Sequence, residues 1–190
     1  QAILPTPVIG GVGLIDDLDR IVGAALPGSD ETLILIGETK GHLGASIYLR
    51  DIEGVAKGPP PPVDLAAERR NGDFVSACHD LSDGGLAVAL AEMALAGACG
   101  ADISEGAPSS KGSPDNPPLA AWLFGEDQAR YLVTTGAAPA LLAAAEQAGV
   151  PARAIGRTGG NSLILAGGEA ISLAELRAGH EGWLPNYMAR

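Results

Sequence analysis

The residues whose types and spacing could do chemistry gather in the stretch His-Asp-Leu-Ser-Asp-Gly-Gly-Leu at positions 79–86. It offers an imidazole, the two carboxylates of Asp80 and Asp83, and the Ser82 hydroxyl. The pair Gly84-Gly85 allows a left-handed backbone and the close approach of another group. A helix that begins here would present free N–H groups to an anion. The stretch therefore predicts a corner that holds a phosphate group or its metal ion.

The same stretch has a purely structural interpretation. Ser82 or Asp83 could cap the helix, Gly84-Gly85 could only form the turn, and His79 could be a hydrogen-bonded residue at the end of a strand. Helix caps and glycine turns are commoner than binding sites, so the stretch taken alone favours this structural alternative.

The elements on either side must position this corner. The preceding residues 74–78, Phe-Val-Ser-Ala-Cys, are small and apolar, as in a buried strand. After the corner, apolar residues recur with helical spacing, which predicts an amphipathic helix over Gly85–Gly97. The expected order is strand, polar corner, helix.

Two further polar corners adjoin predicted strands. Residues 38–42, Glu-Thr-Lys-Gly-His, follow the strand pattern of 32–37, and residues 125–130, Gly-Glu-Asp-Gln-Ala-Arg, lead into a predicted strand at 131–135. Ligands of open α/β sheets collect at the carboxyl ends of strands, so polar corners that follow strands count together. Taken alone, 125–130 is a solvated turn with a weak surface ion pair.

The remaining sequence alternates strand and helix patterns, which indicates an α/β fold with a mixed β-sheet covered by helices. The further predicted helices are 42–52, 65–70, 119–124, 139–149 and 173–178, and the further predicted strands are 8–15, 152–157 and 162–166, the last two around a turn at 159–161. Residues 104–118 are expected to be a surface loop, with disorder as an alternative, and 183–188 an amphipathic tail docked on the body.

The composition limits the classes of protein. A chain of 190 residues with 46% hydrophobic and 4% aromatic residues is expected to be one domain, or a domain with one elaboration, with a core of Ala, Val, Leu and Ile. A net charge of −11 argues against nucleic acid or an acidic membrane as partner. Two cysteines, Cys78 and Cys99, give no zinc pattern and are expected to be reduced. No run is long enough to cross a membrane, so the expected location is the cytoplasm.

Several motifs, in this order, resemble the last domain of the phosphoribosylformylglycinamidine synthase family. They are Pro-Thr-Pro-Val-Ile-Gly-Gly-Val-Gly at 5–13, Leu-Gly-Ala-Ser-Ile-Tyr-Leu at 43–49, Pro-Pro-Pro-Val-Asp-Leu at 60–65, the run at 79–93, Phe-Gly-Glu-Asp-Gln-Ala-Arg-Tyr-Leu-Val at 124–133, and a Trp-Leu-Pro ending. The run at 79–93 is specific, whereas the Gly-rich opening is not. The resemblance implies a fold like the C-terminal domain of aminoimidazole ribonucleotide synthetase.

The resemblance also implies an activity and partners. In that family ATP, with magnesium, phosphorylates the amide oxygen of formylglycinamide ribonucleotide, and ammonia from a separate glutaminase displaces the phosphate, a cytoplasmic step of purine biosynthesis. Residues 1–190 would be a single C-terminal domain, and the start at Gln1 without Met suggests a piece excised from a longer synthetase. The alternatives are a stand-alone ligand-binding or regulatory module of the same fold, and a phosphate-activating enzyme of the wider superfamily.

The resemblance assigns site residues by position. It implies no catalytic residue here, and neither His42 nor His79 takes that role. Asp80 matches a metal ligand of the related domain. The residues implied for an auxiliary site for ATP or ADP, or for its phosphate, are Asp80, Ser82, Asp83, Gly84, Gly85, Glu126, Asp127 and Gln128.

Overall fold

The structure is a computed structural model, which describes residues 10, 12–28, 30–62, 75–104, 106–112, 117–166 and 170–189. The strands are β1 (Thr32–Ile36), β2 (Ala77–Asp80), β3 (Ala101–Asp102), β4 (Tyr131–Thr135), β5 (Ala152–Thr158), β6 (Ser162–Ile164) and β7 (Ala170–Ser172). The helices are α1 (Gly85–Gly97), α2 (Leu119–Phe124), α3 (Ala138–Gln147) and α4 (Leu173–Met188), with a short 3-10 helix at Leu18–Arg20 and a π-helical turn at Tyr48–Ile52. None of the helices in these ranges is long and apolar enough to cross a membrane.

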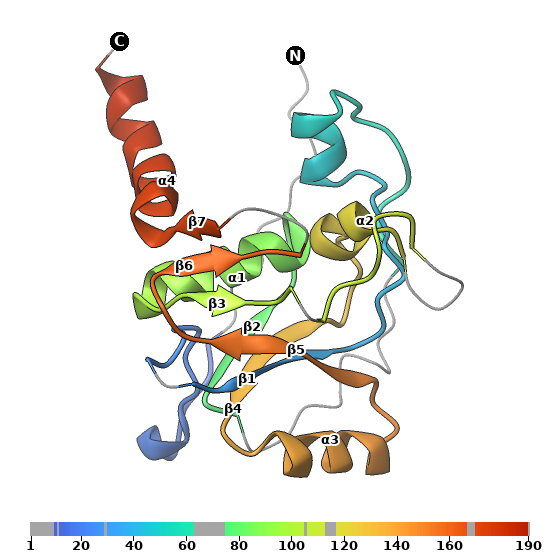
Figure 1. Cartoon of the computed structure of the whole chain (residues 1–190), viewed down its shortest axis with the longest axis vertical. Helices are drawn as coiled ribbons and strands as arrows, with labels where there is room; N and C mark the ends of the chain where they lie inside the picture. The colour runs from blue at the N-terminus through green and yellow to red at the C-terminus, as the bar shows by residue number, and fades with distance from the viewer. Residues whose placement is uncertain are drawn as a thin grey trace.

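One seven-stranded sheet organises the described residues, in the order β2-β4-β1-β5-β3-β6-β7. Only β3 and β6 pair in parallel among these neighbours. Figure 1 shows α3 on one side of the sheet and α1 and α2 on the other. The predicted α/β fold, a mixed sheet covered by helices, is confirmed.

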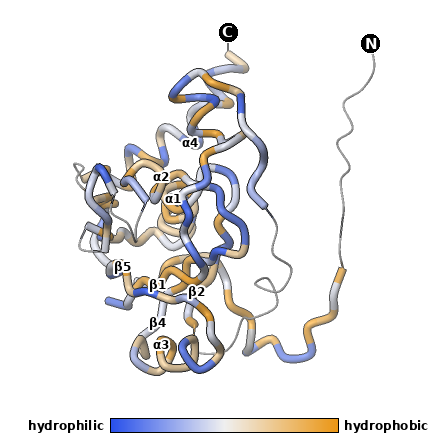
Figure 2. Tube along the Cα trace, turned by 90° about the vertical axis from the view of Figure 1, so that its right-hand side faces the viewer, coloured by the Kyte–Doolittle hydropathy of each residue, from blue (hydrophilic) through white to orange (hydrophobic). Residues whose placement is uncertain are grey.

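The side-chain alternation of β1 explains the two helical layers. Leu33 and Leu35 point into the larger core with α1 and α2, whereas Ile34 points into the smaller core with Leu141 of α3. The larger core is built mainly of Ala and Leu around the fully buried Trp122. Figure 2 shows the concentration of apolar residues along α1 and the neighbouring strands.

Several predicted elements differ in extent or pairing. The predicted helix at 42–52 forms only as the turn Tyr48–Ile52, because Ala45 at φ 59° interrupts a continuous helical backbone. Residues 12–15 form no strand. The strands β5 and β6 do not pair as a hairpin, because β3 lies between them. The tail 183–188 is the second half of α4 and is exposed, so its predicted docking on the body is wrong.

Other predictions agree with the structure or lie outside it. The helix Gly85–Gly97, the helix 119–124 and the strand 131–135 match α1, α2 and β4. The described residues of 104–118 contain no helix or strand before α2 begins. The predicted helix at 65–70 falls outside the described residues. Both cysteines are free, and Cys99 is buried.

Candidate functional site

The sheet topology brings the three polar corners to one edge. Strands β1 and β2 flank β4 and both run antiparallel to it, so Tyr131 at the start of β4 lies opposite Ile36 on one side and Asp80 on the other. The last residues of β1 and β2 therefore lie at the same end of the sheet as the first residue of β4. The corners at 38–42 and 79–86, which the sequence counted together because both follow strands, thus lie beside the corner at 125–130.

The Asp127 carboxylate joins the corner before β4 to the corner after β1. Its Oδ2 accepts a hydrogen bond from Gly41 N at 2.9 Å, and its Oδ1 accepts one from His42 N at 3.2 Å. In return the backbone N–H of Glu126 donates to the His42 carbonyl at 2.9 Å. Asp127 is buried, so its side chain serves these backbone groups rather than solvent.

The Glu126 carboxylate joins the same corner to the start of α1. Its Oε1 accepts hydrogen bonds from Gly84 N and from Ile47 N, each at 2.9 Å. Gly84 is the N-cap of α1, and a glycine has no side chain that could cap the helix. The N-terminus of a helix favours a nearby negative charge. Here the side chain of Glu126 supplies that charge.

Gly84 and Gly85 allow the start of α1 to pack closely against the backbone of residues 123–125. Gly84 and Gly85 have φ values of 80° and 64°, a left-handed conformation that other residues adopt at a cost. A Cβ atom on Gly85 would lie 2.5 Å from the Gly125 carbonyl oxygen. The start of α1 thus lies directly against the backbone that leads into the corner before β4.

The remaining predicted site residues face solvent. Asp80, Ser82, Asp83 and Gln128 are exposed, and the Asp80 side chain is 67% exposed. Strand β2 extends through Asp80, so this residue ends a strand instead of belonging to the turn. We call the three linked segments 38–42, 79–86 and 125–130 the joined corners, and their exposed residues Asp80, Ser82, Asp83 and Gln128 the rim. A ligand can reach Asp80 at this rim.

His79 is held by its neighbours. Its Nδ1 lies 2.6 Å from the Asp80 carbonyl oxygen, and its Nε2 lies 3.1 Å from Oε2 of Glu92 on α1. These contacts tie the end of β2 to the helix that follows the corner. His42 Nε2 contacts the Pro59 carbonyl oxygen at 2.9 Å.

Arg130 overturns the expectation of a surface ion pair in 125–130. Its side chain is only 1% exposed, with Nη1 donating to the Gly125 carbonyl at 3.1 Å and lying 3.7 Å from Asp127 Oδ2. Within the described part of the chain, its Nε and Nη2 are buried without hydrogen-bond partners. Burial lowers the pKa of Arg130 to about 10, against the opposing attraction of Asp127. The sequence showed only a charged residue before a buried strand, and the sheet pairing decides its burial.

Replacing Arg130 by Met should change how stability depends on pH. The guanidinium is charged in folded and unfolded chains below pH 10, but the folded chain loses that proton first as the pH rises. The unfolded chain then binds more protons, so the wild-type free energy of unfolding should rise relative to Arg130→Met. We expect a relative gain of about 1 kcal/mol between pH 8.5 and 11, measured by urea unfolding.

The control for this prediction is Arg157→Met. Arg157 is a surface residue bound to Asp30 at 2.6 Å, and that hydrogen bond raises its pKa. Its protonation therefore does not change in the same interval. A stability difference that stays flat for Arg130→Met would show that burial does not perturb this guanidinium.

The donor set at the rim fits a magnesium ion held partly by other ligands. In the described ranges no group of three His, Cys, Asp or Glu side chains could hold a metal by itself. Magnesium commonly takes one or two carboxylates together with water and phosphate oxygens. Asp80 and Asp83 provide exposed carboxylates of this kind. A nucleotide phosphate here would also need such a cation, because the joined corners carry several negative side chains.

One cation does approach the rim. Arg50, in the π-helical turn, has a raised pKa, caused first by its hydrogen bond to Asp51 and further by the charges of Asp83 and Glu126. The turn is held in place by stacking of Tyr48 on Phe124, with ring centroids 5.0 Å apart. The exposed guanidinium thus lies near the joined corners.

Comparison with known proteins identifies the domain. Residues 28–167 match the family model described as AIR synthase related protein, C-terminal domain. The chain belongs to this family. The matched residues run from the segment before β1 to the one after β6, so the AIR synthase-related domain contains all three corners but not α4.

Close relatives cover the whole chain. It is 56% identical to the phosphoribosylformylglycinamidine synthase subunit PurL of Parvibaculum lavamentivorans and 53% identical to that of Methylocella silvestris. Both comparisons include 100% of this chain and 26% of the relative. The chain therefore spans about a quarter of the length of these curated relatives.

Solved structures share the fold at lower identity. The structure described as T. maritima PurL complexed with FGAR has a TM-score of 0.60 and 22% identity, covering 84% of this chain and 30% of that chain. T. maritima PurL complexed with ADP has a TM-score of 0.55 and 16% identity, covering 84% and 27%. These likenesses show the fold of the AIR synthase-related domain alone.

Proposed function

We propose that this chain is a non-catalytic domain of an ATP-dependent carbon–nitrogen ligase that converts formylglycinamide ribonucleotide to formylglycinamidine ribonucleotide with glutamine-derived ammonia. The observation that carries this proposal is the 56% identity over the whole chain to a phosphoribosylformylglycinamidine synthase subunit PurL. The rest of such a synthetase, and a separate glutaminase component, are the proposed partners. The proposed setting is purine biosynthesis in the cytoplasm.

Within the synthetase, the joined corners would line an auxiliary nucleotide site. Asp80, Ser82, Asp83 and Gln128 are exposed at its rim and would face ATP or ADP, with Asp80 as a magnesium ligand. The bound ion would offset the charge between the carboxylates and the nucleotide phosphates.

The four inner residues of the predicted site would shape this rim. Glu126 and Asp127 already bind backbone N–H groups, including that of Gly84. Gly84 and Gly85 allow the close approach of α1. Their contribution to a nucleotide would therefore be to position the exposed carboxylates.

Genetic replacement tests the proposed activity. The matching segment of the Parvibaculum PurL is exchanged for this chain, and the resulting full-length chimera is expressed in bacteria that lack their own PurL. We expect growth without added purines and formation of the amidine by the purified chimera with glutaminase or ammonia. The 190-residue chain alone should give neither. A folded chimera without amidine formation would overturn the proposal.

The rim residues are tested in the same chimera. Asp80→Ala should reduce the nucleotide and magnesium that copurify with the protein by about tenfold, the usual scale for the loss of a metal contact. The melting temperature of the chimera freed of nucleotide and magnesium should not change, because the Asp80 side chain is exposed. Asp16→Ala removes another exposed carboxylate, outside the corners, and is the control. Unchanged nucleotide and metal content in Asp80→Ala would assign these corners a structural role only.

A further inference from the structure

The second half of α4 exposes an apolar surface that no described residue covers. Four large side chains stand out, with exposed fractions of 65% for Trp183, 57% for Leu184, 59% for Tyr187 and 74% for Met188. The rings of Trp183 and Tyr187 stack on each other with centroids 5.3 Å apart. Contiguous exposed apolar patches of this kind mark interaction surfaces.

The first half of the same helix is anchored. Ser172 and Glu175 form a capping box at its start, and Leu173 and Leu176 pack against the larger core. Arg177 Nη2 also donates to the Leu95 carbonyl at 3.1 Å, which ties α4 to α1. In Figure 1 the helix then continues away from the sheet toward the C-terminus.

The anchored and exposed parts belong to one stripe. With 100° between successive residues, Leu173, Leu176, Trp183, Leu184 and Tyr187 fall within about one third of the helix circumference. The stripe is partly buried where Leu173 and Leu176 pack on the body, and it is exposed beyond that contact. A partner would cover the exposed residues of the stripe in the same way as the body covers Leu173 and Leu176.

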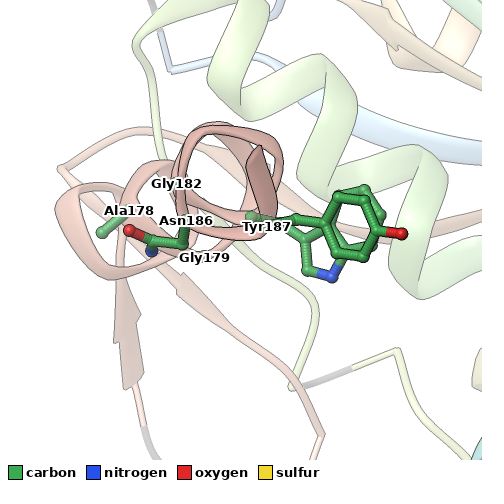
Figure 3. Close-up of a pocket in the computed structure, with 6 residues that line it drawn as sticks. Ala178, Gly179, Gly182, Asn186 and Tyr187 are labelled. Atoms are coloured by element: carbon green, nitrogen blue, oxygen red, sulfur yellow. The ribbon is translucent and has the colours of Figure 1, made fainter. Parts of the chain in front are cut away.

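Small residues widen this surface on one side of the stripe. A hollow of about 310 Å³ lies along this half of the helix. In Figure 3, Ala178 and Asn186 lie on one side of the helix and Tyr187 on the other. Gly179 and Gly182 lie between them. The absence of side chains there lets another backbone approach closely.

The sequence of α4 is poorly suited to a solitary helix. Gly179 and Gly182 each cost about 1 kcal/mol relative to Ala in a helix interior, and Pro185 costs about 3 kcal/mol. Helices in proteins gain most of their stability from the packing of an apolar face. None of the side chains described in α4 is fully buried. Contact with another surface would supply the missing stabilisation.

The comparisons indicate where that surface lies. The AIR synthase-related family model ends at residue 167, before α4 begins, whereas the PurL relatives match the whole chain. The helix is thus shared with PurL subunits and lies outside the domain common to the family. About three quarters of a PurL subunit lies beyond the matched segment. A second copy is disfavoured, because each chain carries a net charge of −11.

We propose that Trp183, Leu184 and Tyr187 of α4 dock on an apolar surface of another domain in the same synthetase polypeptide. The docked helix fixes this domain against its neighbour. This inference rests on the proposed function, since it places the chain within a PurL-type subunit.

Amide hydrogen exchange tests the docking. The exchange of residues 179–188 is compared between the 190-residue chain and the full-length chimera. We expect exchange at least about 100-fold slower in the chimera, because docking must be undone before these amides open. Trp183→Ser with Tyr187→Ser should abolish this protection in the chimera and leave the melting temperature of the 190-residue chain unchanged. Ile52→Ser, at a residue 70% exposed outside α4, is the control and should preserve it.

Each other outcome has a defined meaning. Equal exchange in the two proteins, or protection that survives the double substitution, would overturn the docking. Concentration-dependent protection of the 190-residue chain, with dimers in sedimentation, would assign the surface to a second copy and also overturn it. A chimera that forms the amidine with an unprotected α4 refutes the docking alone. A chimera that protects α4 but forms no amidine refutes the proposed activity alone.

Discussion

Gly85→Ala should destabilise the protein by about 3 kcal/mol. The added Cβ would lie 2.5 Å from the Gly125 carbonyl oxygen, 2.9 Å from the Phe124 carbonyl carbon and 3.0 Å from the Leu123 carbonyl oxygen. All three are backbone atoms, so no side-chain rotation relieves the contact. The φ of 64° adds about 1 kcal/mol, and the overpacking about 2 kcal/mol. Urea unfolding of the 190-residue chain measures the loss.

Gly136→Ala is the matched control for this change. Gly136 follows β4, has no left-handed φ, and offers open space around an added Cβ. Its replacement should change the free energy of unfolding by no more than about 0.5 kcal/mol. If Gly85→Ala proves equally mild, α1 does not need its close approach to residues 123–125.

Glu126→Ala should destabilise the protein by about 2 kcal/mol. One carboxylate oxygen accepts hydrogen bonds from Gly84 N and Ile47 N, and each charge-assisted bond in a partly buried setting contributes about 1 kcal/mol or more. The change also removes the negative charge at the N-terminus of α1. The midpoint of urea unfolding, and faster amide exchange at Gly84 and Ile47, provide the measurement.

Two control substitutions distinguish loss of the Glu126 hydrogen bonds from a general perturbation of residues 125–130. Glu126→Gln retains an oxygen acceptor, so it should lose only about half as much stability as Glu126→Ala. Gln128→Ala, at an exposed residue in the same corner, should stay within about 0.5 kcal/mol of the wild type. A loss in Gln128→Ala as large as in Glu126→Ala would contradict the role of the two backbone bonds.

The candidate site illustrates the limits of a pattern of charged residues. The sequence counted 38–42 and 79–86 together, and the family resemblance added residues of 125–130 to the candidate site. The pairing of β4 with β1 and β2 places all three corners side by side. The sequence did not distinguish exposed carboxylates from those bound to the backbone. That division, with Asp80 open to solvent and Asp127 buried against Gly41 and His42, depends on contacts between residues about 85 positions apart.

The same limit applies to the sheet. Strands with a strong apolar pattern, such as β1 and β4, were predictable from local sequence. The two-residue strand β3 carries almost no periodic signal, yet it separates β5 from β6. The short loop at 159–161 favoured a hairpin, and only the competing hydrogen bonds of β3 exclude it.

The sequence by itself determined the fold class and the helix that follows the twin glycines, because apolar periodicity and local turn chemistry act over a few residues. It indicated the family through the resemblance of several motifs in order along the chain. Only the tertiary structure decided that Arg130 is buried, that Glu126 binds the start of α1, and that the end of α4 lies uncovered. Burial and backbone pairing depend on which distant segments of the chain contact each other, and local composition does not predict those contacts.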